Sequence, residues 1–251
     1  MHFISEHNLD EGIVEREFVL GDISGILWTP SAATASAPVS VLLMGQPGGI
    51  GMRRMYPRLA ARARSSAAQG FAAVTVELPG SGDRTPLPGA EQAHVDLMRA
   101  ISAGDQPGED VVDRLILPLV DATVPEWQIT LDEVLGLPEI TERVGISGGV
   151  IAIGVRLAAT DSRIAAAGLF AGSYVPRLTM EEARQITIPV HVLLQWDDEG
   201  NDRGMALDLF DAFGSAEKIL NANMGGHTGV PHWAGEDAAR FFARHLGAAA
   251  G

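Results

Sequence analysis

The sequence predicts an α/β protein with a mainly parallel central sheet of about eight strands and helices on both faces. Two observations predict this fold class: apolar runs of strand length recur along the chain, and helical stretches separate most of them. Connections of this kind join parallel strands with a right-handed crossover. Because the 251 residues contain no internal repeat and no linker, we expect a single domain over residues 1–251.

The first two expected strands surround the turn at Gly21-Asp22, and the later strands alternate with helices. In chain order we expect strands over 13–19, 23–29, 39–45, 71–77, 142–147, 164–170, 188–195 and 217–223. The third is a continuous apolar run, which is typical of a parallel strand buried on both faces. Since ligands bind such sheets at the carboxyl ends of the strands, the turns after strands are the candidate functional segments.

The longest stretch between two expected strands is a helical insertion over 84–140, after the fourth strand. Breaks in it are expected at Gly104, Pro107 and Pro118, because glycine and proline interrupt helices. We expect this insertion to wall the substrate pocket, with candidate apolar lining residues Met98, Leu115, Leu117, Leu119 and Trp127. The other expected helices run from the turn after the third strand to about Gln69, and over 148–160, 204–213 and 235–246.

The net charge and the amino-acid composition exclude several classes of binding partner and of site. The net charge of −14 repels phosphate backbones and anionic lipids, so neither nucleic acid nor a membrane is an expected partner. The absence of cysteine excludes disulfides, thiolate catalysis and thiolate metal ligands. The first residues lack the pattern of a signal peptide, and no apolar run is long enough to span a bilayer. We therefore expect a cytoplasmic protein that acts on a small-molecule substrate.

The strongest motif is Gly145-Ile146-Ser147-Gly148-Gly149, which has the form G-x-S-x-G between an expected strand and an expected helix. The chemistry needs a serine on a very sharp turn, with its hydroxyl pushed into the site. Its neighbours two residues away must be small, because larger side chains would collide. The helix that begins here directs its amides and dipole at developing negative charge. Ser147 is therefore the candidate nucleophile.

A serine hydroxyl is a weak nucleophile and needs a base. His227 follows the last expected strand, in Met224-Gly225-Gly226-His227, where a loop leaves the edge of the sheet. We favour it as the base, and His232 is the alternative. The remaining histidines are expected on the surface, in helices or in the core of a strand, and they are His2, His7, His94, His191 and His245.

The imidazole in turn needs an acid, which holds its tautomer and stabilises its positive form. The strand over 188–195 ends in Trp196-Asp197-Asp198-Glu199, between the serine and the histidine in chain order. One of the three carboxylates can face His227. Asp198 is the first choice, Asp197 the second and Glu199 the third.

The oxyanion that forms during acyl transfer needs two backbone N–H donors. Gly148 follows the candidate nucleophile directly and is the expected first donor. The second is expected in the turn after the strand over 39–45. Pro47 has no N–H, so the candidates are Gln46 and Gly48.

These residues resemble the α/β-hydrolase superfamily over nearly the whole chain, and within it dienelactone-hydrolase-like and small serine esterase members. Four segments carry the resemblance: Gly45–Gly49, Pro79–Asp83, Gly145–Gly149, and Trp196–Glu199 together with Gly225–His227. The order Ser147, Asp198, His227 is also the order of that superfamily. The resemblance implies a serine hydrolase that cleaves a small uncharged ester, lactone or thioester through an acyl-enzyme, without metal or cofactor.

The sequence departs from the family pattern at two places. Members usually have a small apolar residue and proline shortly after the acid, where this chain has Asn201-Asp202. They often have His-Gly after the third strand, where this chain has Gln46-Pro47, so the Gln46 side-chain amide becomes a further candidate donor.

The second departure motivates an alternative function: a non-hydrolytic enzyme of small-molecule biosynthesis that performs acyl transfer, cyclisation, lyase or isomerase chemistry. Gly45–Gly51, followed by Glu77, could also indicate a nucleotide-binding site. However, the segment does not have the G-x-G-x-x-G spacing, and this interpretation leaves the other motifs unexplained. By analogy, the last helix and the strand over 217–223 could form the interface of a homodimer.

Overall fold

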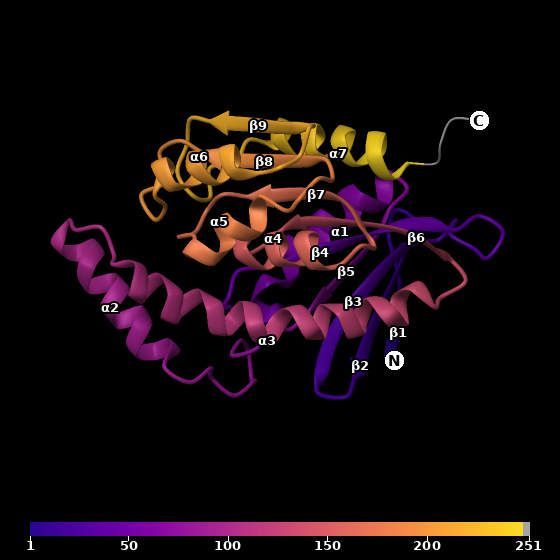
Figure 1. Ribbon diagram of the computed structural model, residues 1–251. Helices are drawn as coiled ribbons and strands as arrows, with labels where there is room; N and C mark the ends of the chain where they lie inside the picture. Colours follow the sequence, from indigo (N-terminus) through magenta and orange to yellow (C-terminus); the bar gives the residue numbers. More distant parts are fainter. Residues whose placement is uncertain (248–251) are drawn as a thin grey trace.

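The computed structural model describes residues 1–247, and a nine-stranded sheet runs through its centre (Figure 1). The strands are β1 His2–Leu9, β2 Ile13–Leu20, β3 Ile23–Pro30, β4 Val39–Gly45, β5 Ala72–Val76, β6 Ile140–Gly148, β7 Ile164–Phe170, β8 Val190–Gln195 and β9 Lys218–Asn223. Their order across the sheet is β1-β2-β3-β5-β4-β6-β7-β8-β9. The sheet is antiparallel from β1 to β5 and parallel from β5 to β9, which confirms the expected mainly parallel sheet.

The strand β1 is an addition to the eight that the sequence predicts. It pairs with β2 at the edge of the sheet, and none of its side chains is buried. Because half-burial is what produces alternation of apolar and polar residues, a strand held mainly by backbone hydrogen bonds carries no such signal.

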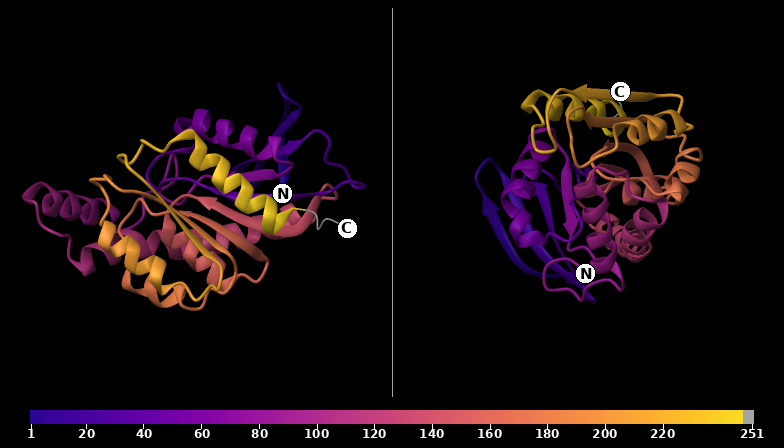
Figure 2. Two further views of the ribbon diagram at one scale, coloured as in Figure 1. Left: turned by 90° about the horizontal axis from the view of Figure 1, so that it is seen from above. Right: turned by 90° about the vertical axis from the view of Figure 1, so that its left-hand side faces the viewer.

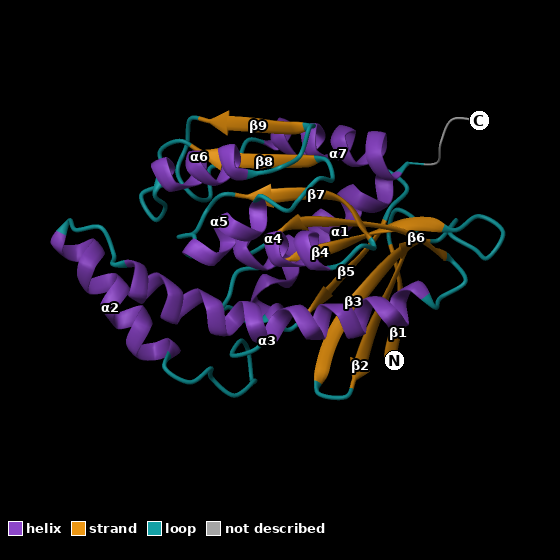
Figure 3. Cartoon of the chain, viewed as in Figure 1, coloured by secondary structure: helices purple, strands orange, loops and turns teal. Residues whose placement is uncertain are grey.

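Helices cover both faces of the sheet, as expected (Figures 1, 2 and 3). They are α1 Met52–Ala68, α2 Ala90–Ala103, α3 Glu109–Leu135, α4 Ile151–Thr160, α5 Arg177–Ala183, α6 Arg203–Ala212 and α7 His232–Leu246. A side chain added at Gly145 of β6 would meet Leu246 and Phe242 of α7, so α7 packs closely on one face. A side chain added at Gly154 of α4 would meet Leu169 of β7, so α4 packs equally closely on the other.

The insertion forms a hairpin of α2 and α3 that extends beyond the sheet on the side to which the parallel strands point (Figure 1). Gly104, with a φ of 75°, ends α2, but the expected break at Pro118 is wrong. Pro118 and Pro125 both lie inside α3, whose 27 residues bury apolar side chains from Val112 to Val134. That burial outweighs a cost of about 3 kcal/mol for a proline in a helix. No helix in residues 1–247 is both long and apolar enough to cross a membrane.

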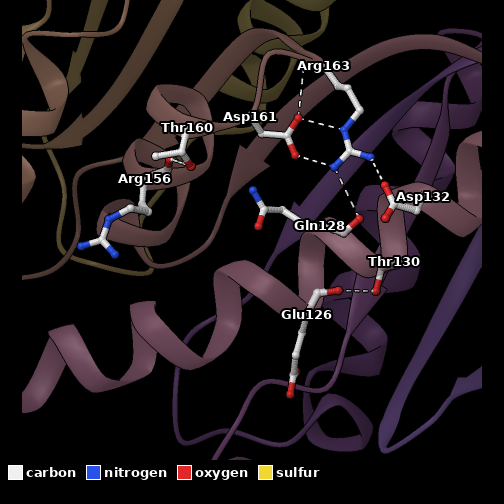
Figure 4. A network of polar contacts seen from close by, with 8 residues as sticks. All are labelled: Glu126, Gln128, Thr130, Asp132, Arg156, Thr160, Asp161 and Arg163. Atoms are coloured by element: carbon white, nitrogen blue, oxygen red, sulfur yellow. Dashed lines mark hydrogen bonds and ion pairs between the residues drawn. The ribbon is translucent and has the colours of Figure 1, made fainter.

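A polar network fastens α3 to the connection between α4 and β7 (Figure 4). The Arg163 guanidinium donates to Asp161 at 2.6 and 2.8 Å, and it also reaches Asp132 and the Gln128 carbonyl on α3. The Arg163 hydrogen bonds hold the pKa of Asp161 below its usual value. The network therefore fixes the base of the insertion relative to the parallel strands.

Candidate active site

The motif residues meet at the carboxyl edge of the parallel strands. β4 ends at Gly45, β6 at Gly148, β8 at Gln195 and β9 at Asn223, and these strands are neighbours or near neighbours in the sheet. The turns that follow them carry the candidate donors, the serine, the acids and the histidine. Segments up to about two hundred residues apart in sequence are thus brought to one edge.

His227 and Asp198 form a hydrogen-bonded pair at this edge. His227 Nδ1 lies 2.7 Å from Asp198 Oδ2. The Asp198 side chain is almost fully buried, at 1 % exposed, whereas that of His227 is 53 % exposed. The rings of His227 and Phe170 pack in a T-shaped arrangement, with 5.3 Å between their centroids. A buried carboxylate therefore holds Nδ1 of an imidazole whose side chain is half exposed.

Backbone and side-chain contacts hold the two loops of this pair together. Gln195 Nε2 donates to the Gly226 carbonyl at 3.1 Å, and Asp197 N donates to the Gly225 carbonyl at 3.1 Å. Asp198 Oδ1 accepts from Gly200 N at 3.0 Å, so both carboxylate oxygens have a donor or partner. The carboxylate is thereby fixed in the orientation that meets the imidazole.

The alternative residues occupy different surroundings. Asp197 and Glu199 are exposed, and Asp198 between them is buried. His232 is the exposed first residue of α7. Of the candidate acids and bases, the structure brings Asp198 and His227 together.

Ser147 lies near the end of β6, with Arg62 of α1 beside it. Arg62 Nη2 donates to the Ser147 carbonyl at 2.6 Å and lies 3.3 Å from Ser147 Oγ. Arg62 Nη1 donates to the Gly45 carbonyl at 2.7 Å. Burial lowers the pKa of Arg62 to about 10, which leaves the guanidinium charged at neutral pH.

The turn after β4 packs directly against the turn after β6. A Cβ atom on Gly45 would lie 2.5 Å from the Gly148 carbonyl oxygen, and one on Gly149 would lie 2.7 Å from Gly45 Cα. Only glycine permits so close an approach of two backbones. The candidate donors Gln46, Gly48 and Gly148 therefore belong to two turns in contact.

No protein-family model matches the sequence, and no curated protein matches it. The structure resembles a cold-adapted esterase from an Arctic intertidal metagenomic library, with 24% sequence identity, a TM-score of 0.76, and coverage of 98% of this chain and 100% of that one. For an acetyl xylan esterase from Paenibacillus sp. R4 the identity is 17% and the TM-score 0.67, over 98% of this chain and 88% of that one.

A third similar structure is a putative dienelactone hydrolase from Klebsiella pneumoniae, with 14% identity and a TM-score of 0.65, over 93% of this chain and 98% of that one. The protein has an α/β-hydrolase fold. The resemblance drawn from the sequence motifs is thereby confirmed at the level of the fold.

The sharp turn of this α/β-hydrolase fold differs from the expectation in one respect. Ser147 is still paired within the sheet, opposite Met44 and Gly168, and the left-handed residues are Gly148 and Gly149, with φ of 64° and 84°. The turn thus begins one residue later than expected. Glycine adopts positive φ at little cost, so the two glycines take the turn and the serine stays in extended backbone.

The contact from Ser147 to His227 that would complete a triad is not among the hydrogen bonds of residues 1–247. Ser147 Oγ has its contact with Arg62, and His227 has its contact with Asp198. Catalytic hydrogen bonds are often long or poorly aligned until substrate binds. The catalytic roles of the three residues therefore stay a prediction.

The candidate oxyanion donors Gln46 and Gly48 make different contacts. The Gln46 side-chain amide is buried and donates to the Val76 carbonyl at 2.5 Å, so it points away from the cleft and only the Gln46 backbone N–H stays a candidate. A Cβ atom on Gly48 would lie 2.8 Å from the Leu119 side chain of α3, so Gly48 packs closely against Leu119. The insertion thus touches the donor turn through Leu119, whereas the candidate lining residue Met98 is exposed.

The cleft beside His227 is lined mostly by glycine and acidic residues: Gly172, Asp197, Asp198, Glu199, Gly200, Gly226 and His227. The three carboxylates in this lining make the cleft negatively charged. No group of three or more histidine or acidic residues in the described part of the chain is arranged to hold a metal ion.

Sequence reasoning did not identify Arg62 or Phe170 as parts of the site. Arg62 had a recognisable signal, because it falls beside Leu59, Ala60 and Ala63 on the buried face of α1. A charged residue on such a face needs a partner in the interior. Phe170 had no signal that separates it from an ordinary core residue.

Proposed function

We propose that the protein is a serine hydrolase that cleaves a small uncharged ester, lactone or thioester through an acyl-enzyme on Ser147. The observation that carries the proposal is the pair of buried Asp198 and exposed His227 at the carboxyl edge of an α/β-hydrolase fold. Such a pair holds an imidazole in the tautomer that accepts a proton on its outer nitrogen. The similar structures that are esterases and a dienelactone hydrolase support the same reaction class.

The proposed reaction has two acyl-transfer steps. Ser147 Oγ attacks the carbonyl carbon while His227 Nε2 takes the hydroxyl proton, and His227 then returns that proton to the leaving group. The backbone N–H groups of Gly148 and of Gly48 or Gln46 stabilise the oxyanion. Water, activated by His227, then releases the acid and restores Ser147.

Ser147 Oγ must face His227 for this reaction. The hydroxyl oxygen accepts from Arg62, so its own proton is left free for another acceptor. Ser147 is partly exposed, and rotation about one side-chain bond redirects its hydroxyl. We propose that substrate binding closes the contact between Ser147 Oγ and His227 Nε2.

The substrate class follows from charge. Asp197, Asp198 and Glu199 line the cleft, and the whole chain carries a net charge of −14. Both would repel an anionic substrate. An uncharged ester, lactone or thioester avoids this repulsion.

Two observations favour a second candidate function. The left-handed residues of the sharp turn are Gly148 and Gly149, and the Ser147 hydroxyl faces Arg62 instead of His227. In this alternative, His227 acts as a base on the substrate itself, in a lyase, isomerase or cyclisation step without a covalent intermediate.

Labelling with a fluorophosphonate probe, located by mass spectrometry, separates the two candidates. We expect an adduct on Ser147 in the wild type and in the exposed control Ser162→Ala, and none in Ser147→Ala or His227→Ala. The same variants are assayed with a panel of small esters and lactones. If folded wild-type protein hydrolyses esters but gives no adduct, or if Ser147→Ala keeps full activity, the acyl-enzyme proposal is wrong.

A further inference from the structure

Arg62 links the turn after β4 to the turn after β6. Its guanidinium reaches across from α1 to the Gly45 carbonyl at the end of β4 and to the Ser147 carbonyl near the end of β6. The same Nη2 that holds the Ser147 carbonyl lies 3.3 Å from Ser147 Oγ. A Cβ atom on Gly148 would lie 3.1 Å from it. One side chain therefore contacts the strand end that carries the candidate nucleophile and the strand end that carries the candidate donor turn.

The partners of Arg62 are neutral. Among residues 1–247, the acceptors that its guanidinium reaches are two backbone carbonyls and one hydroxyl. By contrast, Arg84, Arg156 and Arg163 are also partly buried, and each pairs with a carboxylate. A cation withdrawn from water without a counter-ion is costly, even where carbonyl dipoles solvate it.

Packing alone does not require a cation at this position. Leu59, Ala60 and Ala63 of the same helix fill the interface between α1 and the sheet with apolar side chains. Charged groups held in strained electrostatic surroundings gather at functional sites. The positive charge of Arg62 would be compensated if negative charge developed beside it. Ser147 Oγ is the adjacent atom on which such charge can develop.

We propose that Arg62 is a positioning residue for Ser147, which holds the seryl oxygen and stabilises the negative charge that grows on it as His227 removes the proton. This inference rests on the proposed function. The proton passes from Ser147 Oγ to His227 Nε2, the new bond forms between Oγ and the substrate carbonyl carbon, and Arg62 keeps all its protons throughout. Through Gly45, Arg62 also keeps the donor turn in register with Ser147.

The test compares Arg62→Met and Arg62→Lys with Arg58→Met, which changes an exposed arginine one turn earlier on the same helix. The measurements are the rate of fluorophosphonate labelling at Ser147 and the kcat and KM for a small ester. For Arg62→Met we expect labelling and kcat to fall by about 10²- to 10³-fold, as when one donor to a developing oxyanion is removed, with KM nearly unchanged. Arg62→Lys should lose less, because an ammonium keeps the charge but cannot bridge both strand ends.

Chemical rescue separates this role from a merely structural one. Arg62→Ala leaves space for free guanidinium, and we expect non-denaturing concentrations of guanidinium to restore part of its labelling rate, whereas urea does not. Melting temperatures of all variants show how much of each loss follows from unfolding. If Arg62→Met labels as fast as Arg58→Met, or if its loss only follows its unfolded fraction without rescue, the positioning role is refuted while the proposed function stands. If the wild type does not label Ser147 at all, the proposed function fails, and the role of Arg62 fails with it.

Discussion

At the scale of single residues, burial separates side chains that look equivalent in sequence. Asp197, Asp198 and Glu199 are three consecutive acids, yet only Asp198 is buried and paired with His227. The Gly200 amide occupies its other oxygen, so its orientation is set from two sides. Asp197 is exposed, and its backbone N–H rather than its carboxylate contributes to the site.

The first prediction concerns this pair. In Asp198→Asn, the amide can present its NH₂ to His227 and favour the wrong imidazole tautomer, so we expect kcat to fall by on the order of 10³- to 10⁴-fold. The matched variant Asp197→Asn removes a neighbouring exposed carboxylate and should keep nearly wild-type kcat. Steady-state kinetics on the same ester decide between them. A larger loss in Asp197→Asn than in Asp198→Asn would show that the other carboxylate is the acid.

At the scale of elements, the layer between β8 and α7 contains a buried titratable group. His191 of β8 is 3 % exposed, its ring lies 5.5 Å from that of Phe241 of α7, and its Nε2 has no hydrogen-bond partner within the described part of the chain. Desolvation lowers the pKa of His191, and the charge of Asp237 opposes that shift in part. The folded protein therefore prefers neutral His191, as expected for a histidine in the core of a strand.

The second prediction follows from that shift. Because the pKa of His191 is lower in the folded state, the unfolded chain binds the proton first, and stability should fall as pH decreases from about 7 through the ordinary histidine value of about 6.5. The loss should reach up to about 1.4 kcal/mol per pH unit and cease below the folded pKa. Urea unfolding at several pH values measures this slope.

The control for this prediction is His191→Gln, which cannot titrate and should have a shallower slope. Some slope should persist, since burial also lowers the pKa of His245 on α7. Equal slopes in both proteins would place the pH dependence elsewhere.

At the scale of the whole molecule, one apolar core connects the sheet with the insertion. Buried side chains of α3, including Val120, Trp127 and Leu131, belong to the same cluster as Val74 of β5 and Ile146 of β6. The Arg163 network adds a polar contact between the same parts. The α2–α3 hairpin is thus continuous with the rest of the molecule at its base.

The third prediction is that residues 1–251 unfold as one cooperative unit. Since the insertion shares its core with the sheet, calorimetry should show a single transition, with equal calorimetric and van't Hoff enthalpies. The variant Trp127→Ala should lower the melting temperature of the whole transition, at a cost of about 3 to 5 kcal/mol. Two resolved transitions, of which only one responds to this variant, would contradict the single-domain expectation.

The sequence by itself determined the chain order of eight strands and of the helices other than α5, the mainly parallel sheet, and the segments that meet at its carboxyl edge. Local patterns carry this information, because apolar runs, glycine turns and helix ends report on a few neighbouring residues. The same patterns failed for β1, which is not buried, and for Pro118, where burial along α3 outweighs the local preference of proline.

Only the tertiary structure decided which acid meets His227 and which side chain lies beside the Ser147 hydroxyl, namely Arg62. Ser147 and Arg62 are 85 residues apart, and His227 and Asp198 are 29 apart. Contacts over such distances depend on the register of strands and the packing of α1 against the sheet, and neither is written in any short stretch of sequence. The candidates Ser147, Asp198 and His227 could therefore be named from the sequence, whereas their geometry follows from how the folded chain buries them.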